Sequence, residues 1–239
     1  MKAGFQTAIR QLYPPRCLAC GDQVDSDFGL CGPCWRDTPF VAGTVCEACG
    51  TPVIGGADGF RIECDACMAR ARPWAMGRAA LLYEGQARKL VLSLKHGDRT
   101  DIARPAGKWM VLAGRDILKE GRVIVPVPLH WTRFMRRKYN QSALLAQVIA
   151  GETGLLHLPD LLVRSKRTKS LDHDGIDARF AAMQGAIAVN PKRINRMHGR
   201  EIVLIDDVMT SGATLTACAD ACLSGGARKV CVLVLCRKT

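Results

Sequence analysis

The 239-residue sequence predicts an α/β protein, in which a mostly parallel sheet flanked by helices follows a small N-terminal metal-binding domain. Two observations lead to this fold class. Eight of the twelve cysteines form CxxC pairs near the N-terminus, and the later segments combine short apolar runs with helical patterns, as strand–helix–strand units do. The composition, 48% hydrophobic and 23% charged, excludes wholesale disorder. We expect two domains, over residues 1–75 and 76–239.

The first 17 residues lack the apolar region and small-residue cleavage site of a secretory signal. The longest apolar run, Val230–Cys236, is far shorter than the roughly 20 residues that a membrane-spanning helix needs. We therefore expect a cytoplasmic protein without membrane insertion, whose thiols are reduced. Disulfide scaffolding is the weaker explanation of the cysteines.

The N-terminal domain carries four CxxC pairs within about fifty residues. These are Cys17 and Cys20, Cys31 and Cys34, Cys46 and Cys49, and Cys64 and Cys67. A single pair is compatible with a redox motif, but two pairs complete a tetrahedral zinc site, so eight thiolates predict two zinc ions in a double zinc ribbon. Four thiolates leave no open position for substrate, which favours a structural role. Successive ribbons and a cross-braced pairing both remain open.

The net charge of +12 is concentrated in one part of the chain. Residues 76–200 contain 23 basic and ten acidic residues, whereas residues 1–75 contain seven and eight and residues 201–239 four of each. This distribution predicts a localised surface that attracts an anion, and it argues against an even coat of positive charge.

A phosphate-binding unit is predicted near the C-terminus. Apolar runs at 202–205 and 230–235 read as buried strands, with an amphipathic helix between them. Directly after the first strand come Asp206 and Asp207, and then a loop of small residues that leads into the helix: Thr210, Ser211, Gly212, Ala213 and Thr214. Backbone N–H groups at such a helix start bind phosphate. The paired carboxylates can accept hydrogen bonds from sugar hydroxyls or hold a hydrated magnesium ion.

The segment IVLIDDVMTSGAT resembles the phosphoribosyl pyrophosphate signature of type I phosphoribosyltransferases. In that family the two acids bind the ribose hydroxyls and the loop binds the 5-phosphate. The resemblance implies a phosphoribosyltransferase-like sheet, with Asp206 and Asp207 at the ribose and residues 210–214 at the phosphate. It also implies that phosphoribosyl pyrophosphate and Mg²⁺ are the ligands, although some members of the superfamily only sense this ligand.

The middle of the chain resembles the ComF/GntX proteins. A strand over 123–127 in VPVPL is followed by a basic loop and a helix from about 140 to 150. The residues that match the family here are Arg133, Arg137, Tyr139, Asn140 and Gln141, and further matching pieces lie at Leu94, Lys95 and Gly97. We assign Arg133, Arg137 and Lys95 to substrate binding.

The chain departs from the ComF/GntX pattern at three places. Lys138 stands in place of the usual glycine. In the flap after Thr168, the expected glutamine and asparagine are replaced by Leu171 or Asp172 and by Ala182. The contacts of the flap are therefore not carried over from the family.

Three functions fit these observations. The first is a phosphoribosyltransferase-like protein, in which the chain orients the ligand and Mg²⁺ while pyrophosphate leaves; whether turnover occurs stays open. The ComF resemblance implies a role in competence-linked DNA uptake or in nucleotide metabolism. The second function is a non-catalytic single-stranded DNA-binding competence factor, whose aromatic residues Trp131, Phe134 and Tyr139 either stack on bases or pack in the core. The third is a zinc-ribbon adaptor that docks a DNA-uptake helicase.

Overall fold

The computed structural model describes residues 14–25, 29–55, 61–166 and 175–239. Its central sheet has the strand order β1-β7-β6-β2-β3, and all four pairings are parallel. The strands are β1 (Met76–Leu82), β7 (Lys229–Arg237), β6 (Glu201–Met209), β2 (Val123–Pro126) and β3 (Leu156–His157). A smaller sheet pairs β4 (Leu162–Arg164) with β5 (Ile187–Val189) in the antiparallel sense. The predicted parallel sheet and its three expected strands are confirmed.

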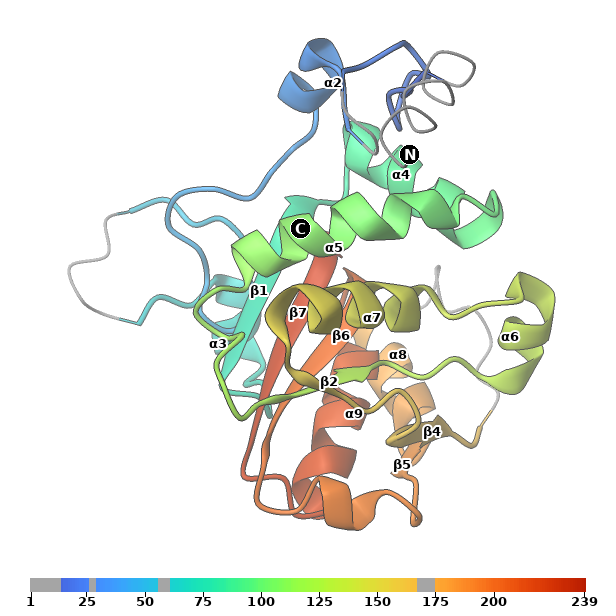
Figure 1. The fold of residues 1–239 in the computed structure, drawn as a ribbon. Coiled ribbons are helices and arrows are strands. Elements are labelled where there is room, and N and C mark those ends of the chain that lie inside the picture. Colours follow the sequence, from blue (N-terminus) through green and yellow to red (C-terminus); the bar gives the residue numbers. More distant parts are fainter. Residues whose placement is uncertain (1–13, 26–28, 56–60, 167–174) are drawn as a thin grey trace.

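Helices cover both faces of the sheet (Figure 1). One face carries α4 (Gly85–His96), α5 (Ala103–Ala113) and α7 (Gln141–Thr153), and the other carries α9 (Ala213–Ser224) with α8 (Ile176–Met183) beside it. Short 3-10 turns span Thr100–Ile102 and Ile194–Arg196. Successive side chains of β6 enter opposite cores, which explains its unbroken apolar run. Among the described residues, no helix has the length and apolar content to cross a membrane.

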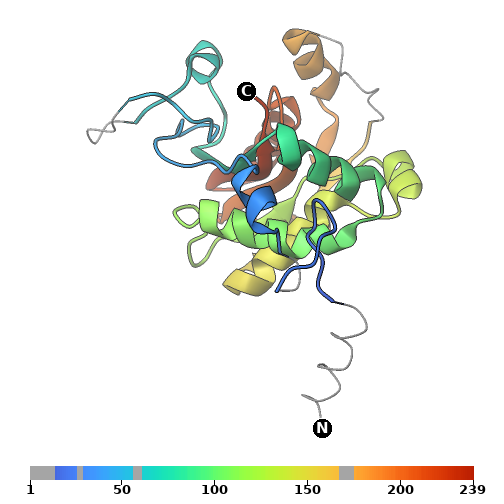
Figure 2. The ribbon, with the colours of Figure 1, turned by 90° about the horizontal axis from the view of Figure 1, so that it is seen from above.

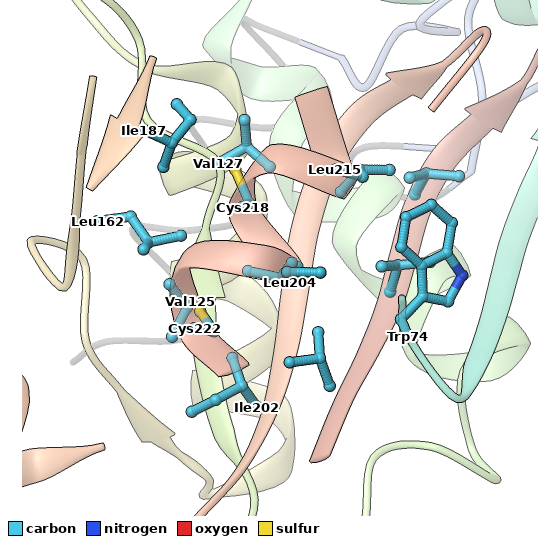
Figure 3. Close-up of a cluster of buried hydrophobic side chains, with 14 of the residues drawn as sticks. Trp74, Val125, Val127, Leu162, Ile187, Ile202, Leu204, Leu215, Cys218 and Cys222 are labelled. Atoms are coloured by element: carbon cyan, nitrogen blue, oxygen red, sulfur yellow. The ribbon is translucent and has the colours of Figure 1, made fainter. Parts of the chain in front are cut away.

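Helix α9 packs on the sheet through two cysteines. Figure 3 shows Cys218 beside Val127 and Cys222 beside Val125, in the buried cluster that also contains Leu204. Both cysteines are fully buried, and Cys231 and Cys236 of β7 are buried to a similar degree. The interpretation of these four residues as small core hydrophobes is confirmed, since all four lie in the two hydrophobic cores on either side of the sheet.

The second ribbon and the linker before it pack against β1. Residues 39–41, which link the two ribbons, run antiparallel to β1, with a bridge between Phe40 and Leu81. This pairing covers a sheet edge that would otherwise be exposed. The second ribbon lies close to the start of β1, because a Cβ added to Gly77 would meet the carbonyl oxygen of Ala48 at 2.3 Å. The indole Nε1 of Trp74 donates to the same carbonyl at 2.6 Å.

Helix α6 (Trp131–Arg137) projects from the molecule after the end of β2, as Figures 1 and 2 both show. It ends at Lys138, whose φ of +64° lies in the left-handed region. Its backbone N–H donates to the carbonyl of Phe134 at 2.7 Å. The backbone thus adopts the conformation that the family's usual glycine favours, although a lysine occupies the position.

Replacing Lys138 with glycine is expected to raise the free energy of unfolding by about 0.5–1 kcal/mol, because glycine adopts a positive φ without a clash of Cβ. Urea denaturation measures the change. The control is Lys138→Ala, which removes the charge but keeps Cβ and should give no gain. An equal gain in both variants would mean that the charge, and not the backbone, is responsible.

Candidate functional site

The eight N-terminal cysteines form two separate tetrads. The Sγ atoms of each tetrad lie within 4.8 Å of one another; the tetrads are Cys17, Cys20, Cys31 and Cys34, and Cys46, Cys49, Cys64 and Cys67. Adjacent Sγ atoms from different pairs are 3.6 Å apart in both tetrads. Tetrahedral zinc with Zn–S bonds of about 2.3 Å requires an edge of about 3.8 Å, so the donor set fits zinc. The pairs combine in sequence order and are not cross-braced.

The two ribbons repeat one local design. In each, a backbone N–H of the third cysteine donates to the Sγ of the first at 3.3 Å, and a short helix follows. These helices are α2 (Gly32–Arg36) and α3 (Asp65–Ala69). A glycine with positive φ follows the second cysteine of each ribbon, at Gly21 and Gly50. The repeated geometry supports two equivalent structural zinc centres.

The acid pair lies toward the C-terminal end of β6, where helices α4 and α7 reach it. Lys95 of α4 places its Nζ 3.0 Å from Asp207 Oδ1, and both side chains are largely buried. Asp206 Oδ1 accepts a hydrogen bond from Ser142 Oγ at 2.8 Å and another from the backbone N–H of Asp207 at 2.9 Å. The structure therefore brings together Lys95 and the two acids, which lie more than a hundred positions apart in the sequence.

The electrostatics of the two carboxylates differ. Burial, together with the negative charge of Asp207, raises the pKa of Asp206 to about 7, although Ser142 and Lys95 act in the opposite direction. Burial disfavours the charge of Lys95, but the attraction of Asp207 outweighs it and the pKa of Lys95 is raised. The site therefore holds more negative charge than its lysine neutralises, and it favours an additional cation or hydroxyl donors.

The predicted phosphate loop connects β6 to α9, and arginines hold its carbonyl groups. Arg237 Nη1 donates to the carbonyl oxygens of Thr210 at 2.7 Å, of Met209 at 3.2 Å and of Lys238. Arg72 Nη1, from the end of the second ribbon, donates to the carbonyl of Ser211 at 2.8 Å. The first N–H group of the 12-residue helix α9, that of Ala213, donates to Ser211 Oγ at 3.4 Å. The next two N–H groups, of Thr214 and Leu215, have no intrahelical acceptor and face a ligand bound at the helix start.

Gly212 precedes α9 with a φ of +84°, and a Cβ there would lie 3.0 Å from Arg72 Nη1 and 3.4 Å from the Trp74 ring. We expect Gly212→Ala to cost about 1–2 kcal/mol in the free energy of unfolding, because alanine is strained at a positive φ, and to weaken phosphate binding by displacing Arg72. Thermal denaturation and phosphate titration measure the two effects. Gly199→Ala is the control for strain alone, since Gly199 also has a positive φ but no neighbour within 4 Å. If both variants bind phosphate equally, the close contact at Gly212 has no effect on binding.

The remaining predicted residues lie in different places. Arg137 Nη1 donates to Gln141 Oε1 at 3.3 Å at the start of α7. Arg133 lies on α6, and its side chain is outside the described part of the structure. Thr168, Leu171 and Asp172 also fall outside the described residues, whereas Ala182 lies on α8. Ala213 and Thr214 form the first turn of α9, and Thr210 Oγ1 accepts from Arg179 at 3.5 Å.

Two family-like residues prove to be supports for the site. The Tyr139 hydroxyl donates to the carbonyl of Leu94 at 2.7 Å, next to Lys95. Asn140 Nδ2 donates to the carbonyl of Val127 at 3.0 Å, and its Oδ1 accepts from the N–H of Ser142 at 3.0 Å, which caps α7. These contacts hold the lysine and the serine that reach the acid pair.

Sequence reasoning missed Ser142, Arg72 and Arg237. Ser142 could have been found from its place in the first turn of the helix after the Asn-Gln element. Arg237 could have been found from the parallel pairing of the last strand with the strand of the acid pair, which places it opposite Met209. No local signal marks Arg72, because its partner Ser211 is 139 positions away.

A cavity of about 510 Å³ lies beside the phosphate loop, between the second ribbon, α8 and the end of the chain. Its charged lining consists of five cationic side chains and one acidic side chain, namely Arg70, Arg72, Arg179, Arg237, Lys238 and Asp177. Only Arg179 among the cations belongs to the basic segment 76–200. The basic excess of that segment therefore does not account for the charge of this cavity, since charge counts along the chain do not show which segments fold together.

A family model for a double zinc ribbon domain matches residues 8–75. The chain is 28% identical to the DNA utilization protein YhgH of Escherichia coli, over 88% of this chain and 91% of that protein. It is 24% identical to the competence protein ComFC of Bacillus subtilis, over 88% of this chain and 89% of that protein. Among solved structures, the chain is similar to a glutamine phosphoribosylpyrophosphate amidotransferase from B. subtilis, with a TM-score of 0.40 and 16% identity. The similarity covers 59% of this chain and 30% of that protein.

Proposed function

This chain belongs to the ComF family, with a double zinc ribbon before a phosphoribosyltransferase-like domain, and we propose that it binds phosphoribosyl pyrophosphate with Mg²⁺ in a competence-related role. The domains would span residues 1–75 and 76–239. Phosphoribosyl transfer is the chemistry that such a site would support. The names of the relatives, DNA utilization and competence proteins, support a role in handling DNA or its nucleotides.

The observation that carries the proposal is the position of the acid pair and the phosphate loop on one strand. Asp206 and Asp207 lie near the C-terminal end of the central strand β6, and the loop that follows leads into the N-terminus of α9. Ligands of parallel α/β sheets bind at this end of the strands. A sugar phosphate could place its phosphate at the helix start and its hydroxyls at the carboxylates, with Lys95 beside them.

Mg²⁺ fits the donors and the charge of this site. The acid pair offers carboxylate oxygens, the ligands that Mg²⁺ prefers, and the raised pKa of Asp206 shows that Lys95 alone does not balance the pair. When bound, Mg²⁺ would neutralise charge on the pyrophosphate leaving group. The residues of the chain would orient the ribose through Asp206 and Asp207 and hold the 5-phosphate at residues 210–214.

Calorimetric titration of the zinc-loaded protein with phosphoribosyl pyrophosphate and Mg²⁺ tests the proposal. We expect saturable binding by the parent protein and a loss of at least about tenfold in affinity in Asp206→Ala and Asp207→Ala, since each removes a charged hydrogen-bond acceptor. Asp160→Ala is the matched control, because Asp160 forms an exposed ion pair with Arg193. Absence of saturable binding by the parent protein contradicts the proposal.

A second candidate function, single-stranded DNA binding, is favoured by α6. Its Trp131 and Phe134 are 68% and 47% exposed, so core packing of these two side chains is excluded. They stand next to Arg137 and Lys138 on a helix that projects from the molecule (Figure 1). Exposed aromatic rings among cationic side chains are typical of surfaces on which bases stack.

The DNA function is tested by measuring affinity for an oligonucleotide at several salt concentrations. We expect the affinity to fall steeply with salt, and Trp131→Ala to weaken binding by about tenfold or more, the scale of one lost stacking contact. Trp35→Ala is the control, because Trp35 is also exposed but lies on the first ribbon. A flat salt dependence contradicts a phosphate-dominated interface.

A further inference from the structure

We propose that the second zinc centre, and not the first, positions the phosphate loop, and that Arg72 is the positioning residue that connects them. The inference rests on the proposed function in so far as the loop binds a phosphate group. It goes further by giving the two zinc centres different roles. The first packs on α5, and the second sets the conformation of the ligand site.

Arg72 makes the direct connection. It lies five residues after Cys67, the last ligand of the second tetrad. Its guanidinium donates from Nη1 to the carbonyl of Ser211 in the phosphate loop at 2.8 Å. It also lies over the ring of Trp74, 5.7 Å from the centroid, and Trp74 is itself bonded to the backbone of the second knuckle at Ala48. The second ribbon therefore holds Arg72 in two ways, through the short chain segment after Cys67 and through the contact with Trp74.

Arg237 holds the same loop from the sheet. It is 5% exposed, and its Nη1 donates to the carbonyls of Met209 and Thr210, where β6 passes into the loop. The loop is therefore held by one arginine of β7 and by one arginine that follows the second ribbon, and only Arg72 depends on the fold of that ribbon.

The first tetrad has a different surrounding. Its ribbon contacts α5, where Phe40 and Trp35 lie 5.4 Å and 6.4 Å from the ring of Trp109. Among the described residues, its sulfurs accept hydrogen bonds from their own ribbon, such as the N–H of Cys31, and none of its residues lines the cavity beside the phosphate loop. By contrast, Ala66, Ala69, Arg70 and Arg72 of the second ribbon line that cavity.

The second ribbon also holds α8 against the cavity. Arg70 forms an ion pair with Asp177 at 2.5 Å, and its guanidinium lies 4.3 Å from the ring centroid of Phe180. Loss of the second zinc ion would therefore release two walls of the site, the loop through Arg72 and α8 through Arg70. Loss of the first would leave both walls in place.

Hydrogen exchange of the full-length, zinc-loaded protein tests this coupling without any ligand. The first matched pair is Cys64→Ser and Cys31→Ser, since both variants replace the third, half-buried cysteine of a tetrad. The second matched pair is Arg72→Gln and Arg61→Gln. Arg61 belongs to the second ribbon but donates to Ala75. We expect exchange in residues 209–216 to rise about tenfold in Cys64→Ser and Arg72→Gln, the scale of one lost charge-assisted hydrogen bond, and to stay unchanged in the other two.

The proposal is overturned if Arg72→Gln leaves exchange in the loop unchanged, or if Cys31→Ser or Arg61→Gln raises it equally. Exchange in α7 reports whether a variant is folded. Should Arg72→Gln lose protection there as well, Arg72→Lys decides, because it keeps the charge and one donor and must raise exchange in the loop only.

Affinity for phosphoribosyl pyrophosphate with Mg²⁺ is the second readout. We expect it to fall about tenfold in Arg72→Gln and to recover in part in Arg72→Lys; a full affinity in Arg72→Gln contradicts the positioning role. If the parent protein does not bind this ligand, the proposed function fails, and the exchange experiment alone decides the coupling.

Discussion

Replacing Asp206 with asparagine is expected to stabilise the protein at pH 8 while it weakens ligand binding by at least about tenfold. Asp206 is nearly isosteric with asparagine, so the shape of the site is kept. The gain arises because burial and the adjacent Asp207 raise the pKa of Asp206 to about 7, which means that its ionised form destabilises the fold. Allowing for partial solvent screening, we expect about 2 kcal/mol in the free energy of unfolding.

The sign of this effect fixes its pH dependence. In the unfolded chain Asp206 titrates near 3.8, whereas in the folded protein it titrates near 7, so the folded state binds more protons between these values. The stability of the parent protein therefore falls as pH rises from about 4 to about 7, and Asp206→Asn removes this contribution. Urea denaturation at pH 4, 6 and 8 should show no gain at pH 4 and the full gain at pH 8.

The control for this prediction is Asp160→Asn, which alters an exposed ion pair and should change neither stability nor binding by a measurable amount. A gain from Asp206→Asn that is the same at all three pH values would contradict the raised pKa. If the Asp206→Asn variant is more stable but binds ligand poorly, the carboxylate of Asp206 is kept for its role in binding, at a cost to the stability of the fold.

The parts of this site that the sequence could predict are local ones. The acid pair, the phosphate loop and α9 lie in one continuous stretch, and the alternation from a buried strand to a small-residue loop to a helix is visible in that stretch alone. The two zinc tetrads likewise follow from the spacing of their cysteines. The pairing of the knuckles needed the structure, because both pairings use the same spacing.

The contacts that complete the site are not local, and for that reason they were not predicted. Ser142 lies 64 positions before Asp206, and Arg72 lies 139 positions before Ser211. Their meeting depends on how the second ribbon and α7 pack on the sheet, through close backbone contacts such as that of Gly77 with Ala48. The assignment of Arg133 and Arg137 to substrate came from family resemblance and stays a prediction; in the structure Arg137 donates to Gln141.

Removal of zinc is expected to occur in two kinetic steps and to unfold both ribbons. The first tetrad includes the exposed Cys20, whereas Cys46 and Cys49 of the second are fully buried. A competing chelator should therefore withdraw the first ion at least about tenfold faster than the second, since access to the sulfurs limits attack. Structural zinc contributes about 10 kcal/mol or more to the folding of such small modules, so neither ribbon should remain folded without it.

Removal of zinc should also destabilise the α/β domain, because residues 39–41 and the second ribbon cover the edge of β1. We expect Tm of the remaining domain to fall by about 10 °C, the scale of a few kcal/mol for a domain of this size. A colorimetric chelator follows zinc release, with Cys31→Ser and Cys64→Ser as the variants that should abolish the fast and the slow step respectively. If about two zinc ions per chain leave at one common rate, the difference in access between the two tetrads is contradicted. If the metal-free chain keeps its near-ultraviolet circular dichroism spectrum, the dependence of the fold on zinc is contradicted.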